Sequence, residues 1–297
     1  MKILNFGSCN IDYVYSMDHI VAVGETQMTY KMEIFPGGKG LNQSIAAARA
    51  GVETYHAGCV GSDGDMLTDV LTESGVNVSC LQKVDAKNGH AIIQVSRLGE
   101  NSIFLHPGSN AMITKEWVDA VIDRFSEGDI LLLQNEINLI DYIVEKAYER
   151  KMTVMLNPSP MNEEIHKIDK QKLSFIVLNE VEAKDISGFD EPEDAISYFR
   201  THYPHLRVML TLGSRGCIYA DEEHTYRQEA YRVKAVDTTA AGDTFTGYFI
   251  AGLVRNLPMP EVLKIATAAS AIAVTQEGAA PSIPLWDNVL SWMEETK

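Results

Sequence analysis

Apolar runs that are typical of strands alternate with helical patterns along most of this chain, and this alternation constrains its fold more than any other feature. The pattern predicts strands over residues 2–7, 54–60, 129–133, 153–156, 175–178, 208–212 and 217–220. It predicts helices over residues 41–50, 63–74, 115–125, 139–150 and 261–276. Strands that alternate with helices pair in parallel, because each helix carries the chain back to the same edge of the sheet. We therefore predict an α/β fold with a central, mostly parallel sheet flanked by helices.

Two further segments suggest β-hairpins. Residues 13–35 alternate apolar and polar side chains around Gly24, and residues 90–95 and 102–106 flank a turn at residues 99–101. By local pattern alone, these hairpins are edge decoration of the main sheet. A chain of 297 residues, 45% of them hydrophobic, can bury one large core. We predict a single domain over residues 1–297, into which the hairpins are inserted at about 13–36 and 89–106.

The stretch V-D-T-T-A-A-G-D-T-F-T-G, residues 236–247, is the candidate catalytic turn. We expect it to join a strand end to a helix start through small residues, which let backbone N–H groups approach a ligand. The positive end of the helix would point at the same place, which favours an anion there. Asp243 would lie in the first helical turn, where it would repel a phosphate unless it acts as the general base for a hydroxyl. The alternative is an ordinary turn in which Asp243 only caps the helix.

Polar residues also follow several predicted strands, at the edge where open α/β sheets bind ligands. Asn10 and Asp12 follow the first strand and point in similar directions by the two-residue period, and Glu136 follows the run I-L-L-L-Q. All three suit the hydroxyl groups of a sugar, although Asn10 and Asp12 also fit an Asx turn. Asn179 and Glu182 begin a helix with N-x-x-E spacing, which is equally the pattern of an ordinary cap.

Two glycine-rich segments permit close approach of a ligand to the backbone. G-G-K-G, residues 37–40, leads into an Ala-rich helix that ends at Gly51, and it is not a Walker A loop because Lys39 is followed by glycine. T-L-G-S-R-G, residues 211–216, follows a predicted strand. Taken alone, the first segment is only a helix entry and the second only a hairpin turn.

Composition argues against several classes of function. Lys and Arg total 25 against 41 Asp and Glu, and the net charge of −16 argues against a nucleic-acid or anionic-membrane surface. No segment approaches a membrane span and the start resembles a first strand rather than a signal peptide, so we expect a cytoplasmic protein. The four cysteines are widely spaced, which predicts buried free thiols rather than a zinc site or disulfides. His202 and His205 lack a third ligand and are expected at the surface.

Four of these motifs occur together in one known family. With G-G-K-G-L-N, N-E-V-E, T-L-G-S-R-G and A-A-G-D in this order, the chain resembles the ribokinase (PfkB) family of carbohydrate kinases nearly end to end. The family's second signature is D-T-x-G-A-G-D, and this chain has Ala240 where glycine is commoner, a variant similar to that of bacterial ribokinases. The resemblance implies that the two hairpins form a β-sheet lid over the sugar, and that the lid also makes a homodimer contact.

The resemblance also implies roles for individual residues. The catalytic group is Asp243, with Ala240, Ala241 and Gly242 supplying backbone N–H groups. The implied sugar-binding residues are Asn10, Asp12, Gly38, Lys39, Asn42, Glu136 and Asp243, with Lys39 near the transferring phosphate. The implied nucleotide-binding residues are Asn179, Thr211, Gly213, Ser214, Gly216, Gly242 and Thr267. Glu182 is implied to bind Mg²⁺ through water, and a K⁺ site is implied at Asp237, Thr239, Ala273, Gln276, Gly278 and Ser282.

The sequence therefore favours a kinase that transfers the γ-phosphoryl group of ATP to a primary hydroxyl of a small sugar, with Mg²⁺ and K⁺ as cofactors. D-Ribose, converted to ribose 5-phosphate, is the preferred substrate. A rival hypothesis keeps the chemistry and changes the acceptor to fructose, a keto-deoxy acid or a nucleoside, for which Phe104 and His90 could offer aromatic surface. A rival of another class is a non-catalytic sugar sensor, against which the intact Asp243, Asn179 and Glu182 argue.

Overall fold

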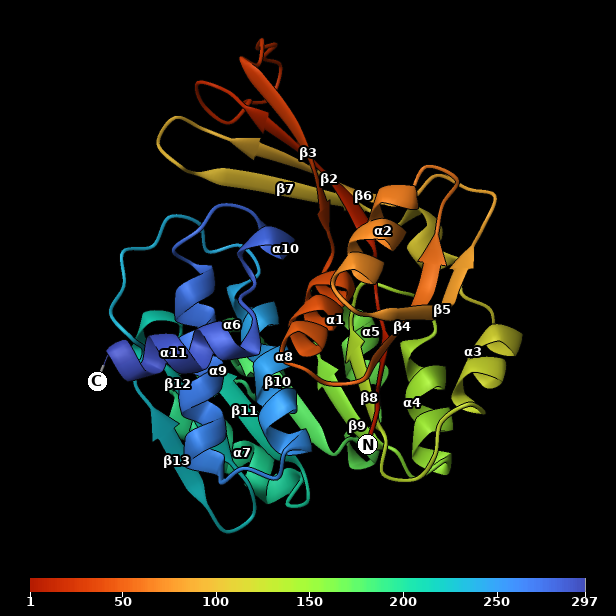
Figure 1. The fold of residues 1–297 in the computed structure, drawn as a ribbon, viewed down its shortest axis with the longest axis vertical. Coiled ribbons are helices and arrows are strands. Elements are labelled where there is room, and N and C mark those ends of the chain that lie inside the picture. Colours follow the sequence, from red (N-terminus) through yellow and green to blue (C-terminus); the bar gives the residue numbers. More distant parts are fainter. Residues whose placement is uncertain (297) are drawn as a thin grey trace.

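A nine-stranded sheet forms the centre of the computed structural model, which describes residues 1–296 (Figure 1). Its strands, in spatial order, are β13 (Thr225–Gln228), β12 (Cys217–Ala220), β11 (Arg207–Thr211), β10 (Phe175–Asn179), β9 (Thr153–Asn157), β8 (Ile130–Gln134), β1 (Ile3–Phe6), β4 (Thr54–Val60) and β5 (Asn77–Lys83). All neighbours from β11 to β5 are parallel, and only β12 and β13 are antiparallel. The predicted fold class is confirmed.

Helices cover both faces of this sheet, which explains why its strands are continuous apolar runs. Alternate residues of one strand enter different cores: Ile130 and Leu132 of β8 belong to one, and Leu131 and Leu133 to the other. The first core is covered by α1 (Lys39–Arg49), α2 (Asp65–Glu73), α8 (Ala241–Val254), α9 (Met259–Ala273), α10 (Ala279–Ser282) and α11 (Trp286–Glu295). The second is covered by α3 (Lys115–Ile122), α4 (Ile140–Glu149), α5 (Glu163–Lys167), α6 (Glu180–Ser187) and α7 (Pro192–His202). Short 3₁₀ turns are η1 (Gly108–Ala111), η2 (Lys170–Lys172) and η3 (Gly213–Arg215).

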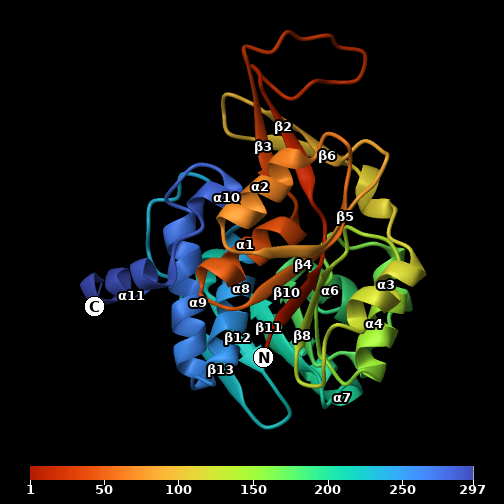
Figure 2. The same cartoon turned by 45° about the vertical axis from the view of Figure 1, so that its right-hand side comes forward.

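A separate four-stranded sheet projects from one end of the main sheet (Figures 1 and 2). It contains β3 (Lys31–Gly37), β2 (Asn10–Ser16), β6 (Gly89–Val95) and β7 (Asn101–His106), in this spatial order. Both predicted hairpins are present, since β2 pairs with β3 and β6 with β7 in antiparallel register. The hairpins join through a parallel pairing of β2 with β6. We call this four-stranded sheet the lid sheet.

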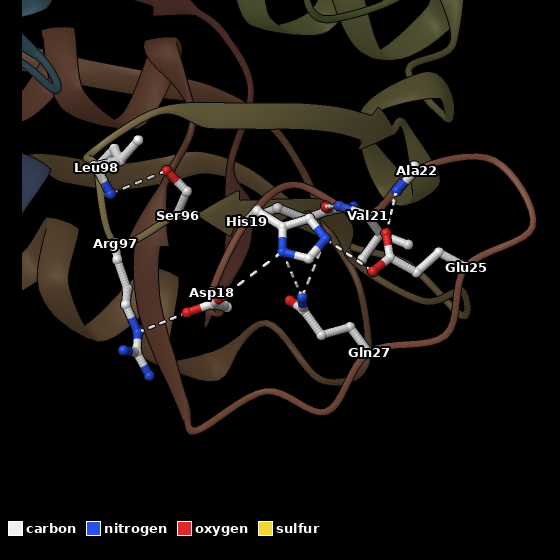
Figure 3. A network of polar contacts seen from close by, with 10 residues as sticks. Asp18, His19, Val21, Ala22, Glu25, Gln27, Ser96, Arg97 and Leu98 are labelled. Atoms are coloured by element: carbon white, nitrogen blue, oxygen red, sulfur yellow. Dashed lines mark hydrogen bonds and ion pairs between the residues drawn. The ribbon is translucent and has the colours of Figure 1, made fainter.

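The long connection between β2 and β3 is ordered by polar contacts of its own (Figure 3). The Glu25 carboxylate lies 2.8 Å from a ring nitrogen of His19 and accepts a hydrogen bond from the Ala22 N–H at 3.0 Å. An ion pair of 3.0 Å between Arg97 and Asp18 ties this connection to the turn between β6 and β7. The tip of the lid sheet is therefore held by exposed polar pairs rather than by an apolar core.

The structure corrects the expected strand end before residue 236. Of the described residues, none between Gln228 and α8 is in a strand. The N–H groups of Val236 and Asp237 instead donate to the carbonyl of Val274, at 2.7 and 3.2 Å, because this segment packs on the end of α9. That helix ends at Ala273 rather than Gln276, and residues 279–282 form α10.

Strands β5 and β13, like helices α5 and α7, were absent from the sequence prediction. Both strands lie at the edges of the main sheet, and in β5 only Cys80 is fully buried. An edge strand that is partly exposed to solvent has no long apolar run, so its sequence pattern resembles that of a loop. None of the helices in residues 1–296 has the length and apolar character needed to cross a membrane. All four cysteines are buried and free, as predicted.

Candidate active site

The start of α1 packs directly against the residues that follow β1. Gly38 has φ = 95°, a conformation that favours glycine, and a Cβ on Gly40 would collide with the backbone of Gly7 and Ser8. The Leu41 N–H donates to the Ser8 carbonyl at 2.9 Å. This close approach brings the polar side chains of the first turns of α1 to the carboxyl end of β1.

The start of α8 faces open space. Ala240 precedes the helix in the left-handed region, with φ = 59°, which explains why glycine is commoner at this position. The Ala241 N–H closes the turn by donating to the Thr238 carbonyl at 3.3 Å. Apart from its chain neighbours and the nearby backbone of its own helix, no atom of residues 1–296 lies within 4 Å of a Cβ built on Gly242. A helix N-terminus with free space in front of it suits an anionic group.

Asp243 lies in the first turn of α8, as predicted, and only 8% of it is exposed. The side-chain amide of Asn42 donates to Asp243 Oδ2 at 3.1 Å, and that of Gln43 donates to Oδ1 at 2.8 Å. Both donors belong to α1, so two helices separated by about 200 residues in the chain meet at this carboxylate. The contacts hold the carboxylate in one orientation.

Asn10, Asp12 and Glu136 gather where the lid sheet meets the main sheet. Asn10 is buried, and its side-chain oxygen accepts a hydrogen bond from the Asn110 amide at 2.7 Å. Glu136 Oε2 accepts hydrogen bonds from Ser8 Oγ at 2.5 Å and from the Lys39 N–H at 3.0 Å. Asn10 and Glu136 also line a cavity of about 280 Å³ beside this point. The three predicted sugar ligands are thus brought to one place.

The carboxyl group of Asp12 is unusual in this group. Burial, together with the charge of Glu136, raises the pKa of Asp12 to about 7. A Cβ on Gly37 would collide with this carboxyl group, so the glycine leaves room for it. Within residues 1–296, no side chain or backbone group donates a hydrogen bond to the Asp12 carboxyl. Its oxygens are therefore available to a ligand.

Lys39 is surrounded by acids. Burial by itself would lower the pKa of its ammonium group, yet that pKa lies above its ordinary value. The charges of three carboxylates, those of Asp243, Glu136 and Glu182, outweigh the burial. Burial raises the pKa of Glu136, while Lys39 opposes that effect. A cation in this position links the candidate base to the candidate sugar ligands.

Asn179 and Glu182 form a complete capping box at the start of α6. The Asn179 N–H and side-chain amide donate to the two Glu182 oxygens at 2.9 Å, and the Glu182 N–H donates back to Asn179 Oδ1 at 2.9 Å. Burial raises the pKa of Glu182. The cap that we considered as an alternative is therefore present, and it fixes the carboxylate at the end of β10.

A second cavity, of about 330 Å³, lies beside the turn between β11 and β12. Its lining includes the predicted nucleotide-binding residues Thr211, Gly213, Ser214, Gly216, Gly242 and Thr267, but not Asn179. Gly216 has φ = 95°, and a Cβ there would collide with the backbone of Gln228. The prediction missed Tyr231, Phe245 and Ser270, which complete the lining from loop 229–240 and from helices α8 and α9. Small and apolar side chains make this a slot for a flat group.

Among the described residues, hydrogen bonds join the expected cation site in two separate groups, one of Asp237, Thr239 and Gly278 and one of Ala273 and Gln276. Asp237 Oδ1 accepts from the Thr239 N–H at 2.9 Å and hydroxyl at 2.6 Å, and Oδ2 accepts from the Gly278 N–H at 3.0 Å. The Ser282 hydroxyl donates instead to the Ala279 carbonyl at 2.8 Å. The exposed Gln276 is joined by its N–H to the Ala273 carbonyl at 3.2 Å.

The profile of the pfkB family carbohydrate kinases matches residues 1–286.

The chain belongs to the PfkB family of carbohydrate kinases. A ribokinase of Haemophilus influenzae is 32% identical to it over 300 residues, which cover 97% of each chain. A ribokinase of Cryptococcus neoformans in complex with ADP has a TM-score of 0.87 at 32% identity, over 98% of this chain and 99% of that one. An Arabidopsis thaliana ribokinase complexed with ribose and ATP has the same TM-score of 0.87 at 26% identity, over 99% of this chain and 98% of that one.

In this PfkB-family chain, sequence reasoning missed several residues around the predicted site. Ser8 and Asn110 hold the predicted sugar ligands, and Gln43 holds Asp243. A signal existed for Gln43, since it follows Asn42 directly in the glycine-rich motif. Ser8 directly follows the first predicted strand, as Asn10 and Asp12 do, and could have been found by the same signal. Asn110 carries no such signal, because its hydrogen bonds to Cys9 and Asn10 join residues about 100 positions apart.

Proposed function

We propose that this kinase transfers the γ-phosphoryl group of ATP to the primary hydroxyl of D-ribose, giving ribose 5-phosphate. The observation that carries the proposal is the buried carboxylate of Asp243, held at the start of α8 by two amides of α1. Gly242, the preceding residue, lines the cavity between β11, α8 and α9, and Lys39 connects Asp243 electrostatically to Glu136. A base between a nucleotide slot and a cluster of sugar ligands suits phosphoryl transfer to a hydroxyl.

The residues divide the chemistry among them. Asp243 accepts the proton of the sugar hydroxyl as the new O–P bond forms and the bond between the transferred phosphorus and ADP breaks. Backbone N–H groups at the start of α8 and the Lys39 ammonium group meet the charge on the phosphoryl oxygens. The lid sheet closes over the sugar and excludes water, which would otherwise compete as an acceptor.

Magnesium fits the acidic side of the site. Within residues 1–296, no three His, Cys, Asp or Glu side chains are grouped to enclose a metal ion. Mg²⁺ keeps several waters and uses one or two carboxylates plus phosphate oxygens, so Glu182, held by Asn179, is a sufficient protein partner. Bound there through water, Mg²⁺ would neutralise charge on the nucleotide phosphates.

The lid sheet supports a small sugar over a nucleoside. By the strand register, Ala91 and Phe35 share the face of Asp12, whereas His90 and Phe104 lie on the other face. The two aromatic residues that could stack on a base therefore point away from the sugar ligands. We expect D-ribose to give the highest kcat/KM in a coupled ADP assay with a panel of pentoses, hexoses, keto-deoxy acids and nucleosides. If another acceptor gives the highest kcat/KM, that acceptor replaces D-ribose as the proposed substrate. If no acceptor is phosphorylated, a non-catalytic sugar sensor is favoured.

Sugar binding is expected to depend on the ionisation of Asp12. Because its pKa is raised from 3.8 to about 7, the group is protonated below that pH and becomes an acceptor of hydroxyl hydrogen bonds above it. We expect kcat/KM for the sugar to fall as pH drops below about 7, while the KM for ATP changes little. Asp12→Asn should weaken sugar binding and remove this limb of the pH profile, measured with Asp141→Asn as an exposed control. A limb that persists in Asp12→Asn belongs to another group.

We propose K⁺ as an activator bound by backbone carbonyls near Asp237 and Gly278. Asp237 ties residues 237–239, the first part of the catalytic turn, to residue 278, so a cation there would orient the N–H groups of the turn without touching the sugar. We expect kcat in K⁺ to exceed that in Na⁺ or a bulky organic cation at matched ionic strength, and Asp237→Ala to remove the difference. Simple screening of a protein of charge −16 would make the three salts equivalent.

We further propose a cytoplasmic homodimer joined through the lid sheet. The lid sheet leaves apolar side chains between 44% and 54% exposed, namely Met32, Ile34, Ile103, Phe104 and Leu105. Large exposed apolar groups on one sheet indicate a contact surface. Sedimentation velocity is expected to give the mass of two chains for the wild type and of one chain for Ile103→Asp. Four free buried thiols suit a reducing compartment, which cell fractionation would test.

A further inference from the structure

Gln43 lies on α1 and is enclosed between this helix, α8 and the main sheet, with only 1% of the residue exposed. Its side-chain amide donates to Asp243 Oδ1 at 2.8 Å and to Asn157 Oδ1 at 3.3 Å. Its oxygen accepts a hydrogen bond from the Gln134 amide at 2.7 Å. All the polar atoms of this side chain are therefore used, and one of them holds the carboxylate assigned as the base.

The direction of these hydrogen bonds is set at both ends of a chain of amides. Asn5 donates to the Gly40 carbonyl at 2.8 Å, and a carbonyl can only accept. The Asn5 oxygen therefore faces Gln134, which donates to it at 3.0 Å and also to Gln43. Gln43 must then present its N–H groups to Asp243, whose two carboxylate oxygens both accept hydrogen bonds from side-chain amides. The two fixed ends agree on one orientation for every amide between them.

This arrangement is retained at a cost to stability. The side-chain oxygen of Gln134 is buried without a hydrogen-bond partner among residues 1–296, and a buried unsatisfied acceptor is unfavourable. An apolar side chain at residue 134 would avoid that cost. The Gln134 amide donates only to Asn5 and Gln43 among the described residues, so it links the fixed Asn5 amide to Gln43, which indicates a role in positioning rather than in stability.

Asn42 and Gln43 have different relations to Asp243. The side-chain oxygen of Asn42 is buried and has no partner among the described residues, so Asn42 is free to accept a hydrogen bond from a sugar hydroxyl. Gln43 has no group left for a substrate. Of the two donors to Asp243, Gln43 is the one dedicated to it.

We propose that Gln43 is a positioning residue for the phosphoryl transfer: it holds Asp243 Oδ1 so that the carboxylate faces the sugar hydroxyl, and the Asn5–Gln134 amides hold Gln43. The proposal rests on the sugar kinase function proposed above. A general base works only in the correct geometry, and misplacement by about 1 Å can cost on the order of 10²-fold in rate. The loss should therefore fall on kcat and not on the KM of either substrate.

The test compares Gln43→Met with Thr54→Val. Methionine keeps the length of the side chain and removes its hydrogen bonds. Thr54 of β4 is also fully buried, and its hydroxyl donates to the Val52 carbonyl at 3.0 Å, outside the chain of amides that leads to Asp243. We expect Gln43→Met to lower kcat by about 10- to 100-fold with both KM values within about threefold of wild type. Thr54→Val should lower the melting temperature and leave kcat within about twofold.

A further variant keeps the test decisive. If Gln43→Met does not fold, Gln134→Leu should show the same fall in kcat without a change in KM. If the wild-type protein phosphorylates the sugar and Gln43→Met, or Gln134→Leu in its place, has the same kcat, the role of Gln43 is overturned and the proposed function stands. A wild-type protein that phosphorylates no sugar overturns the proposed function, and this assignment with it.

Discussion

Asp243→Asn is expected to lower turnover by about 10²- to 10⁴-fold, the range of a lost general base. The variant retains the small-residue turn and the start of α8, so nucleotide binding should survive. Asparagine cannot accept the hydroxyl proton, and its own N–H₂ group would face the amides of Asn42 and Gln43, which now donate to the carboxylate. The measurements are kcat in a coupled ADP assay and calorimetric binding of a non-hydrolysable ATP analogue.

Two controls make this result specific. Asp243→Ala removes the clash between amides and should lose turnover to a similar extent, which separates loss of the base from disturbance of α1. Asp141→Asn changes an exposed acid in the first turn of α4 and should leave kcat unchanged. A lost general base lowers turnover by at least about 10²-fold. If Asp243→Asn and Asp243→Ala both keep turnover within about threefold of wild type, Asp243 is not the base.

Lys39→Met is expected to lower kcat by about 10²- to 10³-fold, similar to the loss of one preorganised donor to developing charge. The ammonium group now stands among the carboxylates of Asp243, Glu136 and Glu182. Its removal would leave these charges, and the phosphoryl group that arrives beside them, without the cation that now offsets them. Lys39 also opposes the rise of the Glu136 pKa, so sugar binding should weaken at low pH in the variant.

Lys87→Met provides the matched control, because Lys87 is exposed and pairs only with Asp63 at the surface. Lys39→Arg keeps the charge but has a planar, longer head, and we expect it to restore part of kcat only. The measurements are kcat and the KM for the sugar at several pH values. A Lys39→Met variant with wild-type kcat and a raised KM for ATP would make Lys39 a ground-state nucleotide ligand instead.

The elements that the sequence predicted correctly are those whose signals are local. The run I-L-L-L-Q of β8 is buried on both faces and has the continuous apolar pattern of a central strand. Gly51, with φ = 78°, ends α1 where its glycine indicated a helix end. The edge strand β5 and the segment before residue 236 were missed or wrong, because their pairing depends on neighbours that the local pattern does not contain.

The same division applies to the site. Asp243, Asn10, Asp12 and Glu136 were identifiable because each follows a strand or opens a helix, where backbone geometry already points a side chain towards a ligand. Their placement at one site agrees with the prediction, and their roles stay predictions until the variants are measured. The network behind Asp243 was not predictable. Gln43 meets Asp243 across 200 positions and Gln134 across 91, and no periodicity links residues so far apart.

By itself, then, the sequence determined the order of the central strands and of most of the helices between them, the two hairpins, the helix start that carries Asp243 and the family. These depend on residue periodicity, turn chemistry and short motifs, which act over a few positions. Only the tertiary structure decided that Lys39 lies among three carboxylates, that Asp12 has a pKa near 7, and that Gln43 holds the base. Charge interactions and desolvation act through space, and it is the packing of α1 and α8 against the sheet that brings these groups within reach of one another.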